Sequence, residues 1–326
     1  MKHRCLLALA PLLLMLAATG HAERRYFTQY DSPAKAPEQA LYYVDLPLPE
    51  NPDGPGYLYR AYYRENDALY AEGARAGAGP DADWFGDWRY LYPDGDIKQR
   101  GHSDDQGRLD GDVISYFENG RIEKLQPYSA GKLDGTEKRY DEDGDLLLEL
   151  PYKDGARHGI RINYYGEGGG REEGRMVDGL RTGTWRGYDD QDRLISVSHF
   201  KKGRLDGEVR ERSGPEGERW TYKHYRQDKQ HGPWRTENAD GEVLESGRYR
   251  DGVPVGEWRT LRDTGEQETA TYVDGELHGE WRLRSASGAL IAERHYDHGD
   301  ATGTWKRFQD GELSYRATFK DGKRQG

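Results

Sequence analysis

Glycine recurs along most of this chain with a period of 23 to 25 residues. The most regular of these residues, called here the anchor glycines, are Gly86, Gly111, Gly135, Gly159, Gly183, Gly207, Gly232, Gly256, Gly279 and Gly303. A fixed period of this length is the signature of a repeat protein, in which each unit packs mainly against its neighbours. The sequence therefore predicts about ten tandem 24-residue repeats over residues 86–326.

Two further glycines keep the same period. The turn glycine lies four residues before the anchor at Gly107, Gly131, Gly155, Gly179, Gly203, Gly252, Gly275, Gly299 and Gly322, with Asp228 in its place once. The loop glycine follows eight to ten residues after the anchor at Gly95, Gly120, Gly144, Gly168, Gly217, Gly241, Gly265, Gly288 and Gly311, with Asp192 in its place once. Asp-Gly pairs recur here, as in Asp143-Gly144, Asp240-Gly241, Asp251-Gly252 and Asp274-Gly275. This pair suits type I′ turns, whose central residues both need positive φ.

Apolar residues occupy fixed positions between the turns. Two residues after the anchor lie Trp88, Val113, Trp185, Val209, Trp234, Trp258, Trp281 and Trp305, and three before the turn glycine lies an aromatic residue in most units. Glycine interrupts every candidate helix, and aromatic and β-branched residues favour strands. Each unit therefore reads as two short strands and two turns. We predict an all-β fold, an elongated repeat array of β-hairpins that forms a single twisted antiparallel meander of about twenty strands.

These segments resemble a known repeat class. The stretches "YVDGELHGEWRLRSASGAL" (Tyr272 to Leu290) and "YKDGARHGIRINYY" (Tyr152 to Tyr165) are similar to MORN repeats, and more narrowly to the bacterial variant found in YwqK-like antitoxin proteins. The resemblance covers about Gly86 to Gly326. It implies a non-enzymatic role as a scaffold, a membrane-associated module or a toxin-neutralising partner. The units at Gly159 and Gly207 depart from the pattern, because Arg161 and Val209 replace tryptophan.

The residues before the repeats divide into three parts. Residues 1–22 combine Lys2 and Arg4 with a short apolar run and small residues up to Ala22, which is typical of a signal peptide cleaved after Ala22. Residues 23–56 are rich in proline and are expected to be a linker or a wrapping segment. Residues 57–85 read as a diverged N-terminal repeat that caps the sheet. We therefore expect a periplasmic or secreted protein.

Composition limits the available chemistry. The chain is poor in hydrophobic residues (34%) but carries 12% aromatic residues, which favours a thin folded structure over disorder. Its net charge of -11 argues against binding to nucleic acid and disfavours anionic lipid. The single cysteine, Cys5, lies in the expected signal peptide, so cysteine chemistry is excluded for the mature protein. No apolar run after the signal peptide is long enough to span a bilayer.

The tryptophans are the candidate binding residues. Trp185, Trp234, Trp258, Trp281 and Trp305 share one register and are the candidate surface for a partner protein or a glycan. The alternative, which periodicity favours, is that they cover a thin sheet whose only core is the side chains on its faces. A single-layer sheet cannot bury both faces, so some aromatic rings must remain exposed or meet a partner.

No catalytic, cofactor or metal site is predicted. His158, His231 and His278 each precede an anchor glycine, but they lie one or more repeats apart, so we interpret them as turn residues. His295, His298, Asp297 and Asp300 form a local cluster that we interpret as a surface loop. The turn aspartates lack the spacing of calcium loops, and no serine-nucleophile or phosphate-loop motif occurs.

A row of basic residues lies three positions after the anchor. It contains Arg89, Lys138, Arg186, Arg210, Arg235, Arg259, Arg282 and Lys306. The row could bind phosphate or anionic lipid, but we favour a solvated face with cross-strand ion pairs to glutamates such as Glu257 and Glu280.

Three functions fit these features. We expect an exported, non-enzymatic repeat protein that acts as a protein–protein interaction scaffold. The first alternative is a toxin-neutralising immunity or antitoxin protein, which the family resemblance implies. The second is a cell-wall glycan binder, because tandem Gly-x-Trp hairpins also resemble choline- and glucan-binding repeats.

Overall fold

The computed structural model describes residues 23–79, 81–166, 169–213 and 218–325. The expected signal peptide, residues 1–22, and the loop glycines Gly168 and Gly217 lie outside these ranges. The chain divides into two compact units, Met1–Arg108 and Leu109–Gly326. Each unit is an open antiparallel sheet, and the only helix among the described residues is the single 3-10 turn η1 (Pro37–Gln39). The predicted all-β repeat meander is thereby confirmed.

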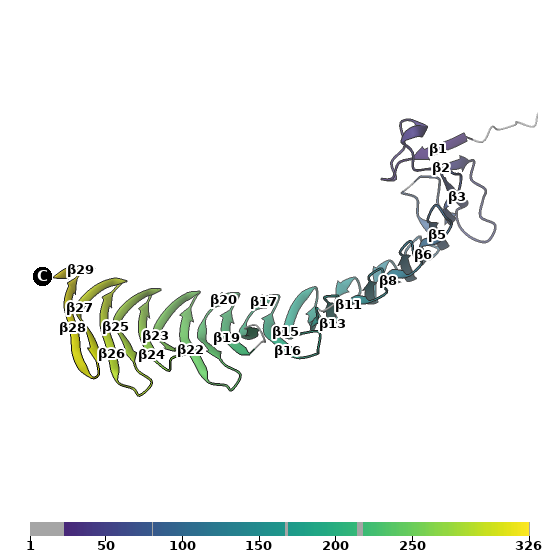
Figure 1. The fold of residues 1–326 in the computed structure, drawn as a ribbon. Coiled ribbons are helices and arrows are strands. Elements are labelled where there is room, and N and C mark those ends of the chain that lie inside the picture. Colours follow the sequence, from purple (N-terminus) through teal and green to yellow (C-terminus); the bar gives the residue numbers. More distant parts are fainter. Residues whose placement is uncertain (1–22, 80, 167–168, 214–217, 326) are drawn as a thin grey trace, which may run out of the picture. The chain divides into compact units, whose positions relative to one another are not determined.

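The first unit is a six-stranded meander. Its strands pair antiparallel in chain order (Figure 1): β1 (Glu23–Phe27), β2 (Tyr42–Leu46), β3 (Tyr57–Tyr63), β4 (Leu69–Arg75), β5 (Trp84–Leu91) and β6 (Ile97–Ser103). The proline-rich segment 23–56 is thus part of the fold, since β1 and β2 extend the sheet beyond β3. Proline suits the connections because it has no N–H group to donate to a neighbouring strand.

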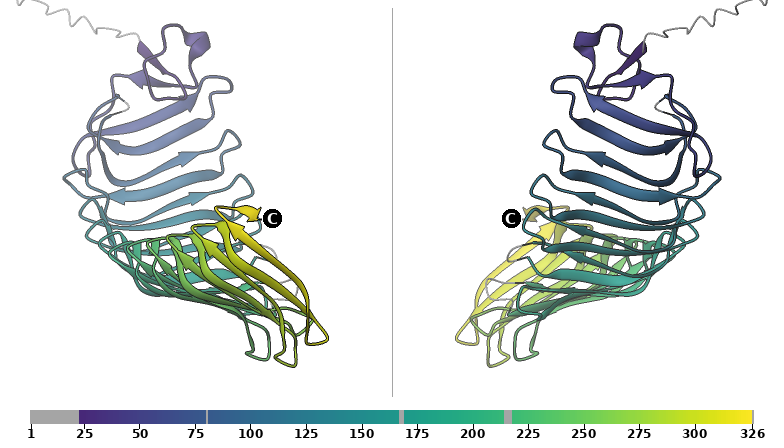
Figure 2. Two further views of the ribbon diagram at one scale, coloured as in Figure 1. Left: turned by 90° about the vertical axis from the view of Figure 1, so that its left-hand side faces the viewer. Right: turned by 90° about the vertical axis from the view of Figure 1, so that its right-hand side faces the viewer.

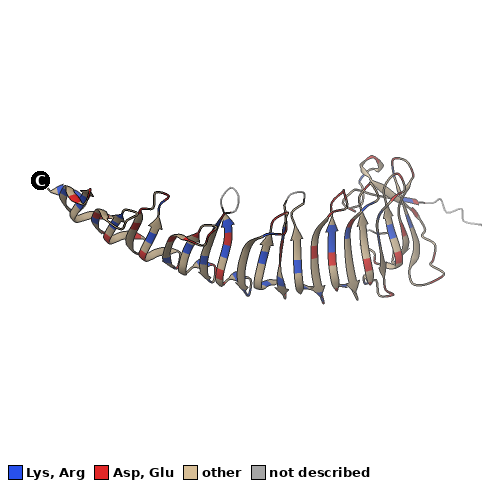
Figure 3. Cartoon of the chain, turned by 60° about the horizontal axis from the view of Figure 1, so that its bottom comes forward, with Lys and Arg blue, Asp and Glu red and all other residues tan. Residues whose placement is uncertain are grey.

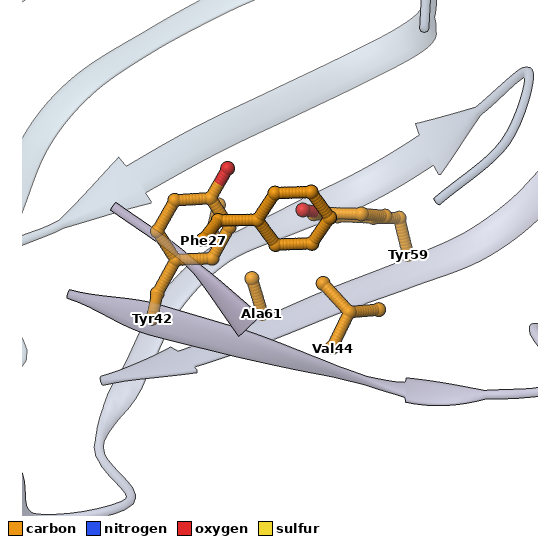
Figure 4. Close-up of a cluster of buried hydrophobic side chains, with 6 residues drawn as sticks. Phe27, Tyr42, Val44, Tyr59 and Ala61 are labelled. Atoms are coloured by element: carbon orange, nitrogen blue, oxygen red, sulfur yellow. The ribbon is translucent and has the colours of Figure 1, made fainter. Parts of the chain in front are cut away.

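A dense aromatic cluster stabilises this unit. Phe27, Tyr42, Val44 and Tyr59 from β1, β2 and β3 are at most 3% exposed and pack together with Ala61 and Ala71, as Figure 4 shows for the labelled residues. Phe27 stacks on Tyr42 with 5.1 Å between ring centroids. The Tyr42 hydroxyl donates to Asp31 Oδ1 at 3.0 Å, so burying this ring leaves its polar atom satisfied.

The second unit is a longer meander whose strands lie side by side in chain order (Figure 2). The strands are β7 (Gly111–Tyr116), β8 (Ile122–Ser129), β9 (Lys132–Leu133), β10 (Gly135–Tyr140), β11 (Leu146–Lys153), β12 (Ala156–Arg157), β13 (Gly159–Tyr164), β14 (Arg171–Val177), β15 (Leu180–Tyr188), β16 (Leu194–Lys201), β17 (Arg204–Leu205), β18 (Gly207–Ser213), β19 (Arg219–Arg226), β20 (Lys229–Gln230), β21 (Gly232–Glu237), β22 (Val243–Arg250), β23 (Val253–Leu261), β24 (Gln267–Val273), β25 (Glu276–Arg284), β26 (Leu290–Asp297), β27 (Asp300–Gln309), β28 (Glu312–Lys320) and β29 (Lys323–Gln325). The two-residue strands precede anchor glycines where the pairing is interrupted.

The three glycines of a repeat have different structural roles. At the turn glycine, Asp251 (φ 53) and Gly252 (φ 91) both have positive φ between β22 and β23, as the predicted type I′ turn requires. At the loop glycine the type I′ prediction is wrong. In Asp143-Gly144 and Asp240-Gly241 only the glycine has positive φ, and Gly144 N–H donates to Asp141 O at 3.0 Å. These loops are longer turns closed by a left-handed glycine, which shifts the strand register by one residue.

Where a strand runs through the anchor position without interruption, the anchor glycine lies in a β-bulge, as in β15, β23, β25 and β27. In β22–β23, Ser246 pairs with Arg259 and Arg248 pairs with Val255, so Gly247 alone faces residues 256–258. Gly256 has a φ of 72, a conformation that glycine adopts without a steric penalty. The bulge therefore fixes where the tryptophan two residues later emerges from the strand.

Candidate functional site

Three of these bulges, in β15, β23 and β25, place a tryptophan over a small residue on the preceding strand. A Cβ atom added to Gly247 would lie 2.2 Å from the ring of Trp258, and one added to Gly174 would lie 2.2 Å from the ring of Trp185. Ala270 pairs directly with Trp281 in the same way. The indole ring lies flat across the neighbouring strand, which is possible only because that strand offers no bulky side chain at this point.

The five candidate tryptophans therefore differ in exposure. Trp185 is 1% exposed, Trp281 8% and Trp258 9%, whereas Trp234 and Trp305 are half-buried. The three buried rings serve as core for the sheet. Only Trp234 and Trp305 present part of an indole ring for a ligand without rearrangement.

Aromatic rings join into a layer on one side of the C-terminal repeats. This aromatic face consists of Trp234, Tyr249, Trp258, Tyr272, Trp281, Tyr296, Trp305 and Phe319. Ring centroids are 5.3 Å apart for Trp234 and Trp258, and 4.5 Å apart for Trp305 and Phe319. Among the described residues of the second unit, no second sheet or helix lies over this layer. It is a semi-exposed aromatic surface rather than a closed core.

Two carboxylates interrupt the apolar character of this face. Burial raises the pKa of Glu245 on β22, and the negative charge of Glu268 on β24, two strands away, raises it further. Glu268 accepts a hydrogen bond from Trp281 Nε1 at 2.6 Å and pairs with Arg262 at 2.5 Å. Burial also raises the pKa of Tyr249 and Tyr272, with Glu245 adding to the effect at Tyr249 and both glutamates adding to it at Tyr272. The face can therefore accept hydrogen bonds as well as pack against apolar groups.

In the first six repeats, the residue two positions after the anchor glycine is less often aromatic. The register that holds tryptophan in the C-terminal repeats holds Glu137 and Arg161 in two successive units. Glu137 is only 1% exposed, and it accepts hydrogen bonds from Arg139 Nε at 2.6 Å and Gln126 Nε2 at 3.2 Å. A buried carboxylate of this kind needs such partners to offset its lost hydration. The aromatic face is thus confined to the C-terminal repeats.

The opposite side of the sheet carries paired charges. Figure 3 shows that basic and acidic residues are interspersed along the strands. Lys138 pairs with Glu149 across strands at 3.1 Å, and Lys306 pairs with Glu293 at 3.3 Å. The prediction of cross-strand ion pairs with the basic row is wrong for Glu257 and Glu280. They pair within their own strands, with Arg259 at 2.6 Å and Arg282 at 2.5 Å, because residues two apart share one face of a strand. The basic row is therefore largely neutralised.

The turn histidines meet aspartates of the next turn. His231 Nδ1 lies 3.2 Å from Asp251 Oδ1, and His158 Nδ1 lies 3.9 Å from Asp178 Oδ1. At the third position, His278 meets both Asp297 and His298. This contact was not predicted from the sequence. The prediction considered the spacing of equivalent histidines in different repeats, and not the residues that lie in successive turns.

None of the described segments is a helix of sufficient length and apolarity to cross a bilayer.

Comparison with solved structures gives no basis for inference about function. The chain is 9% identical to a chain of the "Crystal Structure of TcdB2-TccC3-TEV", with a TM-score of 0.17 and coverage of 86% of this chain and 18% of that chain. For the "Structure of Photorhabdus luminescens Tc holotoxin pore, Mutation TccC3-D651A" the identity is 10%, the TM-score 0.15 and the coverage 82% and 16%. The chain thus spans less than a fifth of either. No curated protein matches the sequence.

Comparison with protein families identifies the repeat itself. The sequence profile of the MORN repeat variant matches residues 109–130 and 133–154. Each matched segment holds an anchor glycine and a loop glycine with the hairpin around them, within the strands β7 to β11. The regular glycine positions carry the same hairpin pattern on through the second unit. The protein is therefore a β-hairpin repeat protein, and two of its repeats match the MORN repeat variant.

Proposed function

We propose that this protein is a non-enzymatic scaffold that binds another protein through the aromatic face of its C-terminal repeats. The observation that carries the proposal is the half-buried pair Trp234 and Trp305 near the two ends of a ring layer that no other described element of the unit covers. Semi-exposed aromatic rings beside hydrogen-bond acceptors such as Glu245 are the side chains that most often dominate protein interfaces.

The opposite face is the weaker candidate. Its charges are paired within the sheet, as in Arg259 with Glu257 and Lys306 with Glu293. A partner would have to break these pairs to use them, which removes much of the electrostatic gain.

We further propose that the protein acts outside the cytoplasm. The proposal rests on the signal-peptide pattern of residues 1–22. Mass spectrometry of the purified mature protein should then find Glu23 as its first residue. A mature chain that retains Met1 would contradict it.

The scaffold proposal is tested with a partner recovered by cross-linking and then purified. The purified partner should bind saturably, and the double variant Trp234→Ala/Trp305→Ala should weaken binding by at least about thirtyfold, as loss of aromatic interface contacts does. The matched control is Arg259→Ala, whose side chain is 72% exposed on the opposite face. It should leave the affinity unchanged. Absence of any saturable partner, or a larger effect of Arg259→Ala, would refute the proposal.

Two narrower functions can be distinguished by further experiments. A toxin-neutralising role of the kind found in YwqK-like antitoxins requires that the partner be a toxin encoded beside this gene, and that deletion of this gene reduce fitness when that toxin is present. A glycan-binding role requires sedimentation with purified peptidoglycan that Trp234→Ala or Trp305→Ala abolishes. The ring exposure of Trp234 and Trp305 fits such stacking, but the neighbouring buried rings Trp258 and Trp281 do not contribute to it.

A further inference from the structure

Two imidazoles and a carboxylate converge where β25, β26 and β27 meet. His278 precedes the anchor glycine in β25, Asp297 ends β26, and His298 lies in the turn to β27. Asp297 Oδ1 is 3.3 Å from His278 Nδ1 and 2.8 Å from His298 Nδ1. The two imidazole centroids are 4.9 Å apart. One ligand atom from each of the three side chains lies within 4.8 Å of the other two.

The equivalent position in another repeat explains why this cluster differs. His231 also faces a carboxylate of the next turn, Asp251, but Arg226 Nη2 pairs with the same oxygen at 3.1 Å. The cation already neutralises that carboxylate. Among the described residues, no lysine or arginine forms an ion pair with Asp297, so its charge faces only the two imidazoles.

The second imidazole arises from a substitution within the repeat pattern. The residue before the turn glycine is aspartate in most turns, with positive φ at Asp178 (49) and Asp251 (53). In this turn the position belongs to His298, which keeps the same backbone conformation with a φ of 46. The repeat geometry that brings an aspartate to His158 or His231 therefore brings a histidine to His278.

The inner nitrogen of His278 lacks a hydrogen-bond partner. His278 Nδ1 is shielded from solvent and makes no hydrogen bond, although Asp297 Oδ1 is 3.3 Å away. A buried polar atom without a partner is unfavourable unless something else satisfies it. A metal ion between the nitrogen and the carboxylate would do so.

We propose that His278, Asp297 and His298 bind a divalent zinc-class ion. Zinc accepts imidazole nitrogen and carboxylate oxygen at about 2.0–2.2 Å in a tetrahedral arrangement, which separates neighbouring ligand atoms by about 3.3 Å. The observed separations of 3.3 and 2.8 Å need only small side-chain rotations to match. Three protein ligands leave the fourth position to water. The ion would join β25 to the turn between β26 and β27, and thereby stabilise two adjacent repeats.

A neighbouring cluster is a poorer candidate. Glu280, Glu293 and His295 also lie within reach of one another on the same hairpin. Arg282 pairs with Glu280 at 2.5 Å, and Lys306 pairs with Glu293 at 3.3 Å. These cations compete with a metal for the carboxylates, so the first cluster is the site that we assign.

The test is titration of the full chain, free of any polyhistidine tag, with ZnCl₂ in a calorimeter, together with the visible absorption of the Co²⁺-loaded protein. We expect one saturable site and the absorption of tetrahedral Co²⁺. His278→Gln and His298→Asn should each weaken binding at least tenfold. Asparagine retains the left-handed turn conformation, so His298→Asn tests the ligand and not the fold.

Two controls make the test decisive. His231→Gln removes the equivalent histidine at the Arg226-paired position and should leave the affinity unchanged, and His295→Gln should do the same for the neighbouring cluster. The far-UV circular dichroism of the metal-free variants should match that of the wild type. Absence of saturable zinc binding, retention of full affinity in His278→Gln, or an equal loss in either control would overturn the assignment.

Discussion

Gly247→Ala tests whether the tryptophans hold the sheet together by lying across it. Gly247 belongs to a strand and does not have positive φ, so alanine would strain the backbone little and would, by propensity alone, stabilise the protein by about 0.5–1 kcal/mol. The new Cβ, however, would lie 2.2 Å from Trp258 Cδ2 and Cε2, whereas carbon atoms in contact are about 3.5–4.0 Å apart. The ring must therefore move by more than about 1 Å.

The steric cost should exceed the propensity gain. Forcing extra atoms into a packed site costs about 1–3 kcal/mol, so we expect a net destabilisation in that range. Because repeat arrays can unfold in stages, the free energy of local opening of β22 and β23 is best measured by native-state hydrogen exchange. The double variant Gly247→Ala/Trp258→Val supplies the control, since Val209 occupies the equivalent position in another repeat.

The double variant should be no less stable than Trp258→Val alone, because without the ring the added methyl group meets no obstacle. Gly174→Ala, beneath Trp185, should reproduce the single-variant effect. If Gly247→Ala is neutral or stabilising, or if its effect adds fully to that of Trp258→Val, the proposed packing of ring over glycine is refuted.

Three other variants test separate parts of the structure. The raised pKa of Glu245 means that the folded state holds this proton more tightly than the unfolded state, so stability falls as pH rises above the unfolded value of about 4.3. Glu245→Gln should remove this loss, and identical urea midpoints for variant and wild type from pH 4 to pH 7 would contradict it. Arg294 lies 4.3 Å from the ring centroid of Trp281 and 5.2 Å from that of Trp305, so Arg294→Ala should cost about 1–2 kcal/mol in urea unfolding, with part recovered in Arg294→Lys. An unchanged Arg294→Ala protein would exclude this stacking. Gly252 has a φ of 91 in its type I′ turn, so Gly252→Ala should cost about 1–2 kcal/mol and Gly252→Asn less, and equal stabilities would show a different turn.

The fold was predictable because the repeat constrains it strongly. The turn and anchor glycines have positive φ, as their positions in the repeat led us to expect. The regular spacing of Trp258 and Trp281 placed these two residues on one face. The predicted turn type failed at Asp143-Gly144, because the Asp-Gly pair alone does not distinguish a two-residue turn from a longer loop closed by a left-handed glycine. The strand register decides between them, and the sequence does not display it directly.

The site was less predictable, because it depends on contacts between repeats. The small residue beneath each buried ring lies eleven positions before the tryptophan, as with Gly174, Gly247 and Ala270, and this spacing was available in the sequence. The difference in exposure between Trp185 and Trp234 could not be predicted from the sequence, because both residues lie two positions after an anchor glycine. The contact between His278 and His298 depends on which turns lie next to each other along an edge of the sheet.

The C-terminal repeats carry an aromatic layer with a buried base and an uncovered surface. Hydroxyl-radical footprinting of the isolated protein, read by mass spectrometry at single-residue level, measures this directly. We expect Trp234 and Trp305 to be oxidised markedly faster than Trp185, Trp258 and Trp281. Equal oxidation of all five, or protection of Trp234 and Trp305 to the level of Trp185, would contradict it.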